Sequence, residues 1–496
     1  MLYKKPLDLL LKEAAETGEG TLKRTLGAGN LIALGIGAII GSGLFVRTAA
    51  AAAEHAGPAV TFAFIFAAIG CALAGLCYAE FASMIPIAGS AYTYSYATMG
   101  EVVAWVIGWD LVLEYAVGAA TVSIAWSEYL NKLLETFDMN IPYQFCHSPF
   151  QHSLDGVQGI INLPALFIVA LLSLVLIRGT KESATVNNMI VILKVSIVVL
   201  FIALGWGYMN PVNHTPYIPP STTEKFGDFG WSGIISAAGV VFFAFIGFDA
   251  VSTAAQEAKN PKKDMPIGIL VSLAICTVLY VLFGHVLTGV ANYKEFAIAG
   301  KEASVAYTIE TYMHEYHWLS ILVTVAILAG FSSVILVMLL GQSRVFFSMS
   351  KDGLVPKVFS AVHPKFKTPY KSNLIFLVFV GLFAAFVPGD VVGDMTSIGT
   401  LFAFSLVCLG VIILRKTDPH RERPFKTPLM PLVPILGILV CGAMMYGLGR
   451  HNWERLIIWM AIGFVIYFTY SIKNSVLRKT GKTVFPKDPP APTITE

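Results

Sequence analysis

The stretch Leu34-Gly35-Ile36-Gly37-Ala38-Ile39-Ile40-Gly41-Ser42-Gly43-Leu44-Phe45 decides the fold, because it is apolar yet interrupted by glycine. Four glycines and one serine fall within nine residues, and glycine is a poor helix former. A helix in lipid satisfies its own backbone, so an interruption is tolerated only where protein or a water-filled cavity accepts the freed N–H and C=O groups. The sequence therefore predicts a membrane helix that breaks midway through the bilayer.

A similar stretch, Phe242-Phe243-Ala244-Phe245-Ile246-Gly247-Phe248-Asp249-Ala250, follows five spans later and places a glycine close to a charge. Small residues by themselves usually mark close helix packing. Their recurrence at the same place in two five-helix blocks favours a transporter built from inverted repeats, with its substrate at the broken helices. Half-helix N–H groups attract a carboxylate and freed carbonyls attract an ammonium, so the two breaks suit an α-amino acid.

The composition of the chain is typical of a membrane protein. Of 496 residues, 56% are hydrophobic and 13% are charged, which is about half the ~25% found in soluble domains. A globule of this length cannot cover its surface with so little polar material, so a soluble enzyme is excluded. The net charge of +3 gives no reason to expect a nucleic-acid partner.

The six cysteines imply neither a disulfide framework nor a metal centre. Five lie inside apolar runs, and Cys146 stands alone in a polar loop. That loop also holds His147, His152 and Asp155, but their spacing matches no closed zinc site, and an ordinary polar loop is the simpler interpretation. No cofactor is expected.

Twelve apolar runs are long enough to cross a bilayer core of ~30 Å. If the N-terminus is inside, the inner segments hold 26 of the 34 Lys and Arg, and the outer loops hold seven, including Arg47. Because basic residues are retained in the cytoplasm, both termini are expected there, with the chain in the plasma membrane. The runs extend over approximately 30–53, 58–85, 100–134, 160–178, 184–208, 231–256, 266–290, 317–348, 373–389, 391–414, 429–449 and 453–474.

Ionisable residues inside these spans each cost ~2.5 kcal/mol or more, so each should face protein or water. Asp110 and Glu114 are four residues apart and share a helix face. Two carboxylates so close repel one another unless one is protonated or a cation lies between them. That cation is either a basic group of a substrate or the side chain of Lys194. Asp249 either completes a ring of acidic groups or accepts hydrogen bonds from unwound N–H groups at the second break.

Lys194 lies near the middle of its span with apolar residues on both sides, so it cannot easily extend to water. Burial disfavours the charged form of an amine, which makes Lys194 a candidate proton carrier. A static ion pair is the alternative. Glu80, shortly before Pro86, lies near the inner surface and is interpreted as a gate or loop anchor rather than as a ligand.

The first broken segment, from Leu26 through Phe45, resembles the first-helix signature of the amino acid-polyamine-organocation superfamily. The resemblance covers about residues 20–430 and is closest to bacterial relatives of the cationic amino acid transporters. It implies two inverted five-helix repeats, at 30–208 and 209–414, two further helices within 415–474, and cytoplasmic ends at 1–29 and 475–496. The other matching stretches are Tyr78-Ala79-Glu80-Phe81-Ala82, Ser90-Ala91-Tyr92-Thr93-Tyr94, Gly247-Phe248-Asp249-Ala250, Asn260-Pro261 with Pro266-Ile267-Gly268-Ile269, and Asp352-Gly353-Leu354-Val355-Pro356.

The same resemblance implies roles for individual residues. A substrate carboxylate would lie at Gly41, Ser42 and Gly43, and the amino group at Phe243, Ala244 and Ile246, with Phe243 also a gate. Glu114 and Asp249 would face a cationic side chain, with Asp110 nearby. Lys194 would occupy the place of a sodium ion in sodium-coupled relatives, which implies proton coupling. The chain departs from the family's pattern at two positions. Ser42 stands where threonine is common, and Gln256 stands where a glutamate is expected. These departures concern the selectivity for side chains and the inner gate.

These observations predict a proton-coupled importer of amino acids that works by alternating access and prefers Arg, Lys or ornithine. Its partners would be the amino acid, protons and the lipid bilayer, and the sequence points to no particular small membrane-protein partner. A broad neutral amino acid carrier or exchanger is the alternative, with the acidic residues serving the gate. An amino acid sensor is the non-transport alternative. The chain has no HExxH, no GxSxG and no clustered His within the spans, so no enzyme is expected.

Overall fold

The computed structural model describes residues 3–5, 26–85, 90–153, 155–178, 184–221, 223, 225–253, 255, 258–297, 304–366 and 368–479. Regular structure within these residues is helical, and only two isolated β-bridges occur, Leu26 with Ala258 and His152 with Gln158. The all-α membrane class predicted from the sequence is confirmed. Gln256 and most of the expected end segments 1–29 and 475–496 lie outside the described residues.

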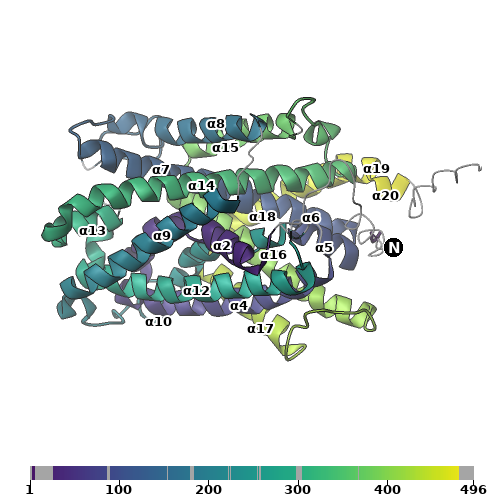
Figure 1. Cartoon of the computed structure of the whole chain (residues 1–496), viewed down its shortest axis with the longest axis horizontal. Coiled ribbons are helices and arrows are strands. Elements are labelled where there is room, and N and C mark those ends of the chain that lie inside the picture. The colour runs from purple at the N-terminus through teal and green to yellow at the C-terminus, as the bar shows by residue number, and fades with distance from the viewer. Residues whose placement is uncertain are drawn as a thin grey trace, which may run out of the picture.

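The helices run along the long axis of the molecule as a bundle (Figure 1). Eight helical segments of the described chain are long and apolar enough to cross a membrane, and four shorter apolar helices accompany them. That the chain crosses the membrane twelve times, and that it contains an inverted repeat, remain predictions. The long segments contain α4 (Val60–Met84), α6 (Glu101–Val112) with α7 (Gly118–Glu135), α9 (Ala184–Gly205), α10 (Gly230–Val241), α12 (Pro261–Val290), α14 (His317–Lys351), α16 (Gly389–Thr417) and α18 (Arg450–Ile466). The shorter helices are α2 (Ala28–Ile39), α8 (Leu163–Arg178), α15 (Tyr370–Phe386) and α17 (Leu432–Gly447).

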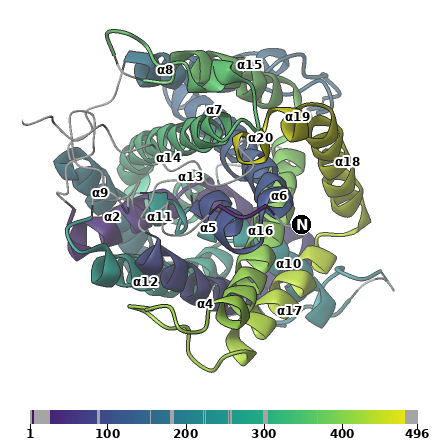
Figure 2. The ribbon, with the colours of Figure 1, turned by 90° about the vertical axis from the view of Figure 1, so that its right-hand side faces the viewer.

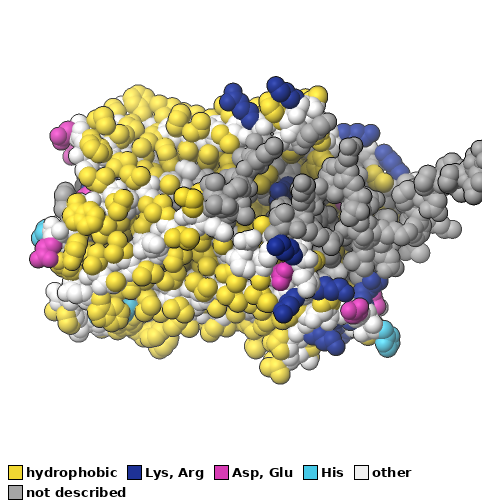
Figure 3. Space-filling view, viewed as in Figure 1, with side chains coloured by type: hydrophobic (Ala, Val, Ile, Leu, Met, Phe, Trp, Pro, Cys, Tyr) yellow, Lys and Arg dark blue, Asp and Glu magenta, His cyan; other side chains and the backbone are white. Residues whose placement is uncertain are grey.

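Apolar side chains cover the sides of the bundle, as contact with lipid requires (Figure 3). Ile192, Val278 and Ile457 are examples of large apolar residues that are exposed on different helices. In water, such surface would cost about 25 cal/mol for each Å², whereas hydrocarbon removes that cost. The exposed faces of these helices therefore agree with the membrane class.

The two ends of the bundle differ in charge. We call the end that carries residues 3–5 and α20 (Val476–Lys479) the terminal end, and the opposite end, with α13 (Ser304–Tyr312), the distal end (Figure 1). Most of the Lys and Arg side chains visible in Figure 3 lie at the terminal end. Seen from that end, α8 and α15 lie side by side at one margin of the bundle and α18 lies at another (Figure 2).

Ion pairs hold the terminal end together. Asp352, directly after α14, accepts a hydrogen bond from Tyr92 at 2.7 Å and forms an ion pair with Lys5 at 3.3 Å. The buried carboxylate of Glu101, at the start of α6, accepts a hydrogen bond from Arg478 Nε at 2.6 Å. These contacts fasten both described ends of the chain to the bundle.

Candidate substrate site

The first break separates α2 from the helical structure that follows it. The helix α2 ends at Ile39, and Ile40 is extended, with φ −71° and ψ 104°. Helical structure resumes with η1 (Gly43–Arg47), a π-helical turn, and continues to Ala56. The interruption predicted around Gly41 is therefore present, and it leaves the carbonyls at the end of α2 without their intrahelical partners.

The second break follows α10 and its 3-10 continuation η8 (Phe242–Phe245). The chain turns through residues 246–249 before α11 (Ala250–Thr253) begins. Gly247 has φ +114°, a conformation that side chains with a Cβ rarely adopt. The glycine noted in the sequence therefore permits the turn that ends the helix.

The two breaks touch one another in the centre of the bundle. A Cβ atom at Gly43 would lie 2.3 Å from Ala244 Cα, and one at Gly247 would lie 2.8 Å from the carbonyl oxygen of Ala38. Only glycine permits this approach at both places. The structure thereby brings the predicted carboxylate-binding residues Gly41, Ser42 and Gly43 beside the predicted amino-group residues Phe243, Ala244 and Ile246.

Lys194, on α9, binds the broken end of α2. Its Nζ donates hydrogen bonds to the carbonyl oxygens of Gly37 at 2.8 Å and Ile40 at 3.1 Å. Gly330 on α14 makes room for the lysine, because a Cβ there would lie 2.8 Å from Lys194 Cε. The side chain is buried, and its ammonium binds main-chain carbonyls. It therefore does not neutralise the acidic residues predicted to lie near it.

Tyr280, on α12, joins the two breaks. Its hydroxyl lies 3.0 Å from the carbonyl oxygen of Ile39 and 2.9 Å from that of Ala244. A tyrosine hydroxyl carries one proton, so it donates to one of these carbonyls at a time. The other carbonyl retains the capacity to accept a hydrogen bond from an ammonium group.

Glu114 and Asp249 form a buried acidic pair. Glu114 lies on η4 (Leu113–Val117), a π-helical turn between α6 and α7, and such turns often occur at functional sites. The Tyr115 hydroxyl donates a hydrogen bond to Asp249 Oδ2 at 2.7 Å. No N–H group and no hydroxyl among the described residues donates to the Glu114 oxygens. Neighbouring buried carboxyls of this kind are stable only when a proton or a cation joins them.

Asp110 lies one helical turn from Glu114, and we call Asp110, Glu114 and Asp249 the acidic cluster. Asp110 is buried, and neither of its carboxylate oxygens accepts a hydrogen bond from the described residues. It approaches α16, because a Cβ at Gly399 would lie 3.1 Å from Asp110 Oδ1. Tyr115, the chain neighbour of Glu114, thus reaches Asp249, whereas Asp110 lies at the edge of the cluster beside α16.

A cavity of about 210 Å³ opens at the distal end and extends to the first break. We call it the distal cavity. Its wall includes the exposed Asp390 at the start of α16 and the buried Ser42 at the break. Ser42 Oγ has no hydrogen-bond partner among the described residues. The serine predicted to bind a carboxylate therefore borders a cavity that opens at one end of the bundle. Other residues in the wall include Arg47, Thr121, Glu128 and Gln151.

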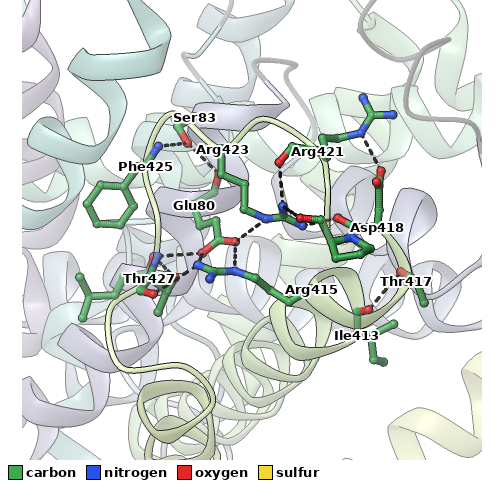
Figure 4. A network of polar contacts seen from close by, with 12 residues as sticks. Glu80, Ser83, Ile413, Arg415, Thr417, Asp418, Arg421, Arg423, Phe425 and Thr427 are labelled. Atoms are coloured by element: carbon green, nitrogen blue, oxygen red, sulfur yellow. Dashed lines mark hydrogen bonds and ion pairs between the residues drawn. The ribbon is translucent and has the colours of Figure 1, made fainter.

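Glu80 anchors a loop at the terminal end of α4 (Figure 4). Its two carboxylate oxygens accept hydrogen bonds from Arg415 at 2.9 and 2.7 Å, and one also accepts the Thr427 N–H at 2.8 Å. Arg423 adds an ion pair at 3.3 Å. The carboxylate fastens the segment after α16 to α4, so the structure gives Glu80 the contacts of a loop anchor and not those of a substrate ligand.

Two tyrosines of the site are not predicted from the sequence, and one arginine lies elsewhere than predicted. Tyr280 and Tyr115 carry no distinctive signal, because tyrosine is common in apolar helices and their partners lie far away in the chain. Arg47 was expected in an outer loop, but it lies in η1 and is only 5% exposed. A signal was available for Arg47, because it follows the first break by one turn and has no loop residues next to it.

Comparison with known proteins decides the family. Residues 26–468 match the family described as Amino acid permease. The chain belongs to the amino acid permease family. This permease is 45% identical over 466 residues to the branched-chain amino acid permease BcaP of Bacillus subtilis (strain 168), which covers 94% of this chain and 97% of that relative.

Two further relatives of this permease are named for other substrates. It is 41% identical over 479 residues to a methylthioribose transporter of Bacillus subtilis (strain 168), covering 97% of this chain and 99% of the relative. It is 33% identical over 402 residues to the vacuolar cationic amino acid transporter 4 of Arabidopsis thaliana, covering 81% of this chain and 65% of the relative. The permease is a multi-pass membrane transporter of amino acids and not an enzyme, and family membership alone does not select the substrate side chain.

Proposed function

We propose that this permease imports amino acids together with protons and prefers substrates with a cationic side chain, such as Arg, Lys or ornithine. The observation that carries the proposal is the acidic cluster, whose members are all buried at the centre of the bundle. Lys194, a buried cation of the same bundle, binds backbone carbonyls instead. A basic group of the substrate would supply the missing positive charge.

The backbone of the substrate would lie between the two breaks. Its carboxylate would accept hydrogen bonds from Ser42 and from the N–H groups around Gly41 and Gly43, where the second half of the first helix begins. Its ammonium would donate to freed carbonyls at Phe243, Ala244 and Ile246, with Phe243 covering the site. Support comes from the free Ser42 hydroxyl and from the single Tyr280 proton shared between two carbonyls.

Proton coupling would act through Lys194. A charged ammonium has enough protons to serve both carbonyls at the end of α2, whereas a neutral amine is a weaker donor. Loss of the proton would therefore loosen the first break and allow α2 to move. The two hydrogen bonds to Gly37 and Ile40 support this role, because they join the titratable group directly to the broken helix.

We extend the proposal to topology. The chain would cross the plasma membrane twelve times, with inverted repeats at 30–208 and 209–414, two helices within 415–474, and both ends cytoplasmic. The concentration of Lys and Arg at the terminal end supports this orientation (Figure 3). Cysteine substitutions at Lys225 and Lys416 would test it. An impermeant maleimide added to cells should label the first and not the second.

A neutral substrate is the second candidate, and the similarity to a branched-chain amino acid permease favours it. In that case one proton shared between Glu114 and Asp249 would stabilise the acidic pair in place of a substrate cation. The side chain of the substrate would then meet the apolar wall of the site rather than a carboxylate.

Competition for uptake separates these candidates. The purified permease in proteoliposomes should take up radiolabelled arginine, and an inward proton gradient should increase the initial rate. Lysine and ornithine should compete, whereas leucine and methylthioribose should compete weakly. Strong competition by leucine with none by lysine would select the neutral candidate, and competition by methylthioribose alone would remove the amino acid proposal.

A further inference from the structure

The distal cavity is large enough to hold a molecule of its own above the central site. Its volume of about 210 Å³ corresponds to roughly seven water molecules at ~30 Å³ each, which is more than a small amino acid needs. Ser42 forms part of the wall nearest the first break, and the exposed Asp390 belongs to the opposite, distal part. The cavity therefore joins the central site to the distal surface.

Arg47 supplies the cavity with a buried positive charge. The side chain is 5% exposed, and one guanidinium nitrogen forms an ion pair with Asp394 on α16. Arg47 Nε donates no hydrogen bond to any residue that the structure describes. Gly393 on α16 packs closely against the guanidinium, because a Cβ atom at this position would lie 3.3 Å from Nε. A buried donor without an acceptor is costly, so this side of the guanidinium is suited to an incoming anion.

Acidic side chains line the same cavity. Glu128 on α7 and Asp390 on α16 both contribute to its wall, together with the amide of Gln151. A site that combines one arginine with two carboxylates suits a molecule that carries both charges. A free amino acid is such a molecule, because its carboxylate can bind the guanidinium while its ammonium approaches the carboxylates.

We infer that the distal cavity is a second, outer amino acid subsite, in which Arg47 receives the substrate carboxylate before it moves to Ser42. This inference rests on the proposed function of the central site. Arg47 follows Ser42 by five residues, so the two lie no more than about 7.5 Å apart along the helix axis at the α-helical rise of ~1.5 Å per residue. One amino acid cannot place its carboxylate at both, and a single short displacement carries it from one to the other.

Two substitutions distinguish binding of the substrate by Arg47 from the structural role of its ion pair with Asp394. Arg47→Gln removes the charge, and Asp394→Asn breaks the same ion pair while leaving the guanidinium in place. In proteoliposomes with the distal end outward, we expect Arg47→Gln to raise the KM for alanine uptake about tenfold, as loss of one charged hydrogen bond predicts. Asp394→Asn should leave that KM within about twofold. An equal rise in both variants would overturn the inference.

Efflux provides a second readout. An outer subsite is the first contact for substrate that enters from outside, so Arg47→Gln should not change the half-saturating internal alanine concentration for efflux. A structural defect in the moving helices would change both directions. If efflux and uptake are affected equally, Arg47 serves the conformational change and the subsite does not exist.

Filling the cavity tests the inference without altering Arg47. Ala125 on α7 lines the cavity and is buried, so Ala125→Leu should occupy part of the space and also raise the KM for uptake several-fold. An unchanged KM in this variant would reject the subsite even if Arg47→Gln does not fold. Absence of both arginine and alanine uptake by the wild-type permease would instead reject the proposed function itself.

Discussion

The two broken helices are interrupted in the same manner, but different groups complete them. At the first break, carbonyls of Gly37 and Ile40 are held by Lys194 from α9, and Ser42 Oγ has no partner among the described residues. At the second break, the chain contributes its own carboxylate, Asp249, which Tyr115 holds at 2.7 Å. One break is completed by a titratable amine and lies open to a cavity, whereas the other carries a fixed acidic group.

This difference suggests a division of labour between the breaks. The hydrogen bonds at the first break depend on the protonation of one lysine, so we expect that break to respond to pH and to bind the part common to all amino acids. The second break presents Asp249 beside Glu114, so we expect it to distinguish side chains. Substitutions at each break should therefore produce different defects.

The contact between the breaks gives the largest expected effect. Gly43→Ala would place a Cβ 2.3 Å from Ala244 Cα, and backbone atoms cannot move aside as a flexible side chain can. Overpacking of this kind costs ~1–3 kcal/mol or more, so uptake should fall to about 1% of wild type. Gly442→Ala is the matched control, because a Cβ there meets nothing within 4 Å. Normal uptake by Gly43→Ala would show that the breaks need not touch.

Replacement of the lysine tests whether the first break is the pH-responsive one. Lys194→Ala removes both hydrogen bonds to α2, so uptake driven by a proton gradient should fall at least about tenfold. Counterflow exchange, which needs no net proton movement, should remain within about threefold. Lys473→Ala, an exposed lysine at the terminal end, serves as the control. Unchanged driven uptake would remove Lys194 from the coupling scheme.

Removal of the Ser42 hydroxyl tests the common part of the substrate. Ser42→Val should raise the apparent binding constant about tenfold for arginine and alanine alike, because both carry the carboxylate. Ser42→Thr keeps the hydroxyl and should bind both substrates normally. The measurement is competition binding to purified protein. Normal constants in the valine variant would place the carboxylate elsewhere.

Neutralisation of the acidic pair should give the smallest and most selective effect. Glu114→Gln should weaken arginine binding about fivefold relative to alanine binding, since only arginine carries the second cation. Asp110→Asn should change the ratio less, because Asp110 lies at the edge of the cluster beside α16. Parallel titrations of both substrates would measure the ratio. Equal losses for arginine and alanine would contradict cation selectivity and favour the neutral candidate.

Much of the fold and part of the site follow from local sequence. Glycine clusters predict both interruptions, because glycine lowers helix stability wherever it occurs. Buried charges such as Lys194 and Glu114 are evident within apolar runs. The contacts between helices are not evident, because Lys194, Tyr280 and Tyr115 each bind a group on a distant segment of the chain and carry no local signal of it. Arg47 was assigned to an outer loop although it falls inside the apolar run 30–53, which continues past the first break.

The sequence by itself determined that the chain is an all-α membrane protein, where its helices weaken and which charges lie within apolar segments. These properties depend on near neighbours in the chain and on the low polarity of lipid. Only the tertiary structure decided that Lys194 binds carbonyls rather than a carboxylate, that Tyr115 holds Asp249, and that a cavity reaches Ser42. Each of these depends on contacts between helices that are far apart in sequence, and packing of the whole bundle fixes which of the possible partners comes within hydrogen-bond distance.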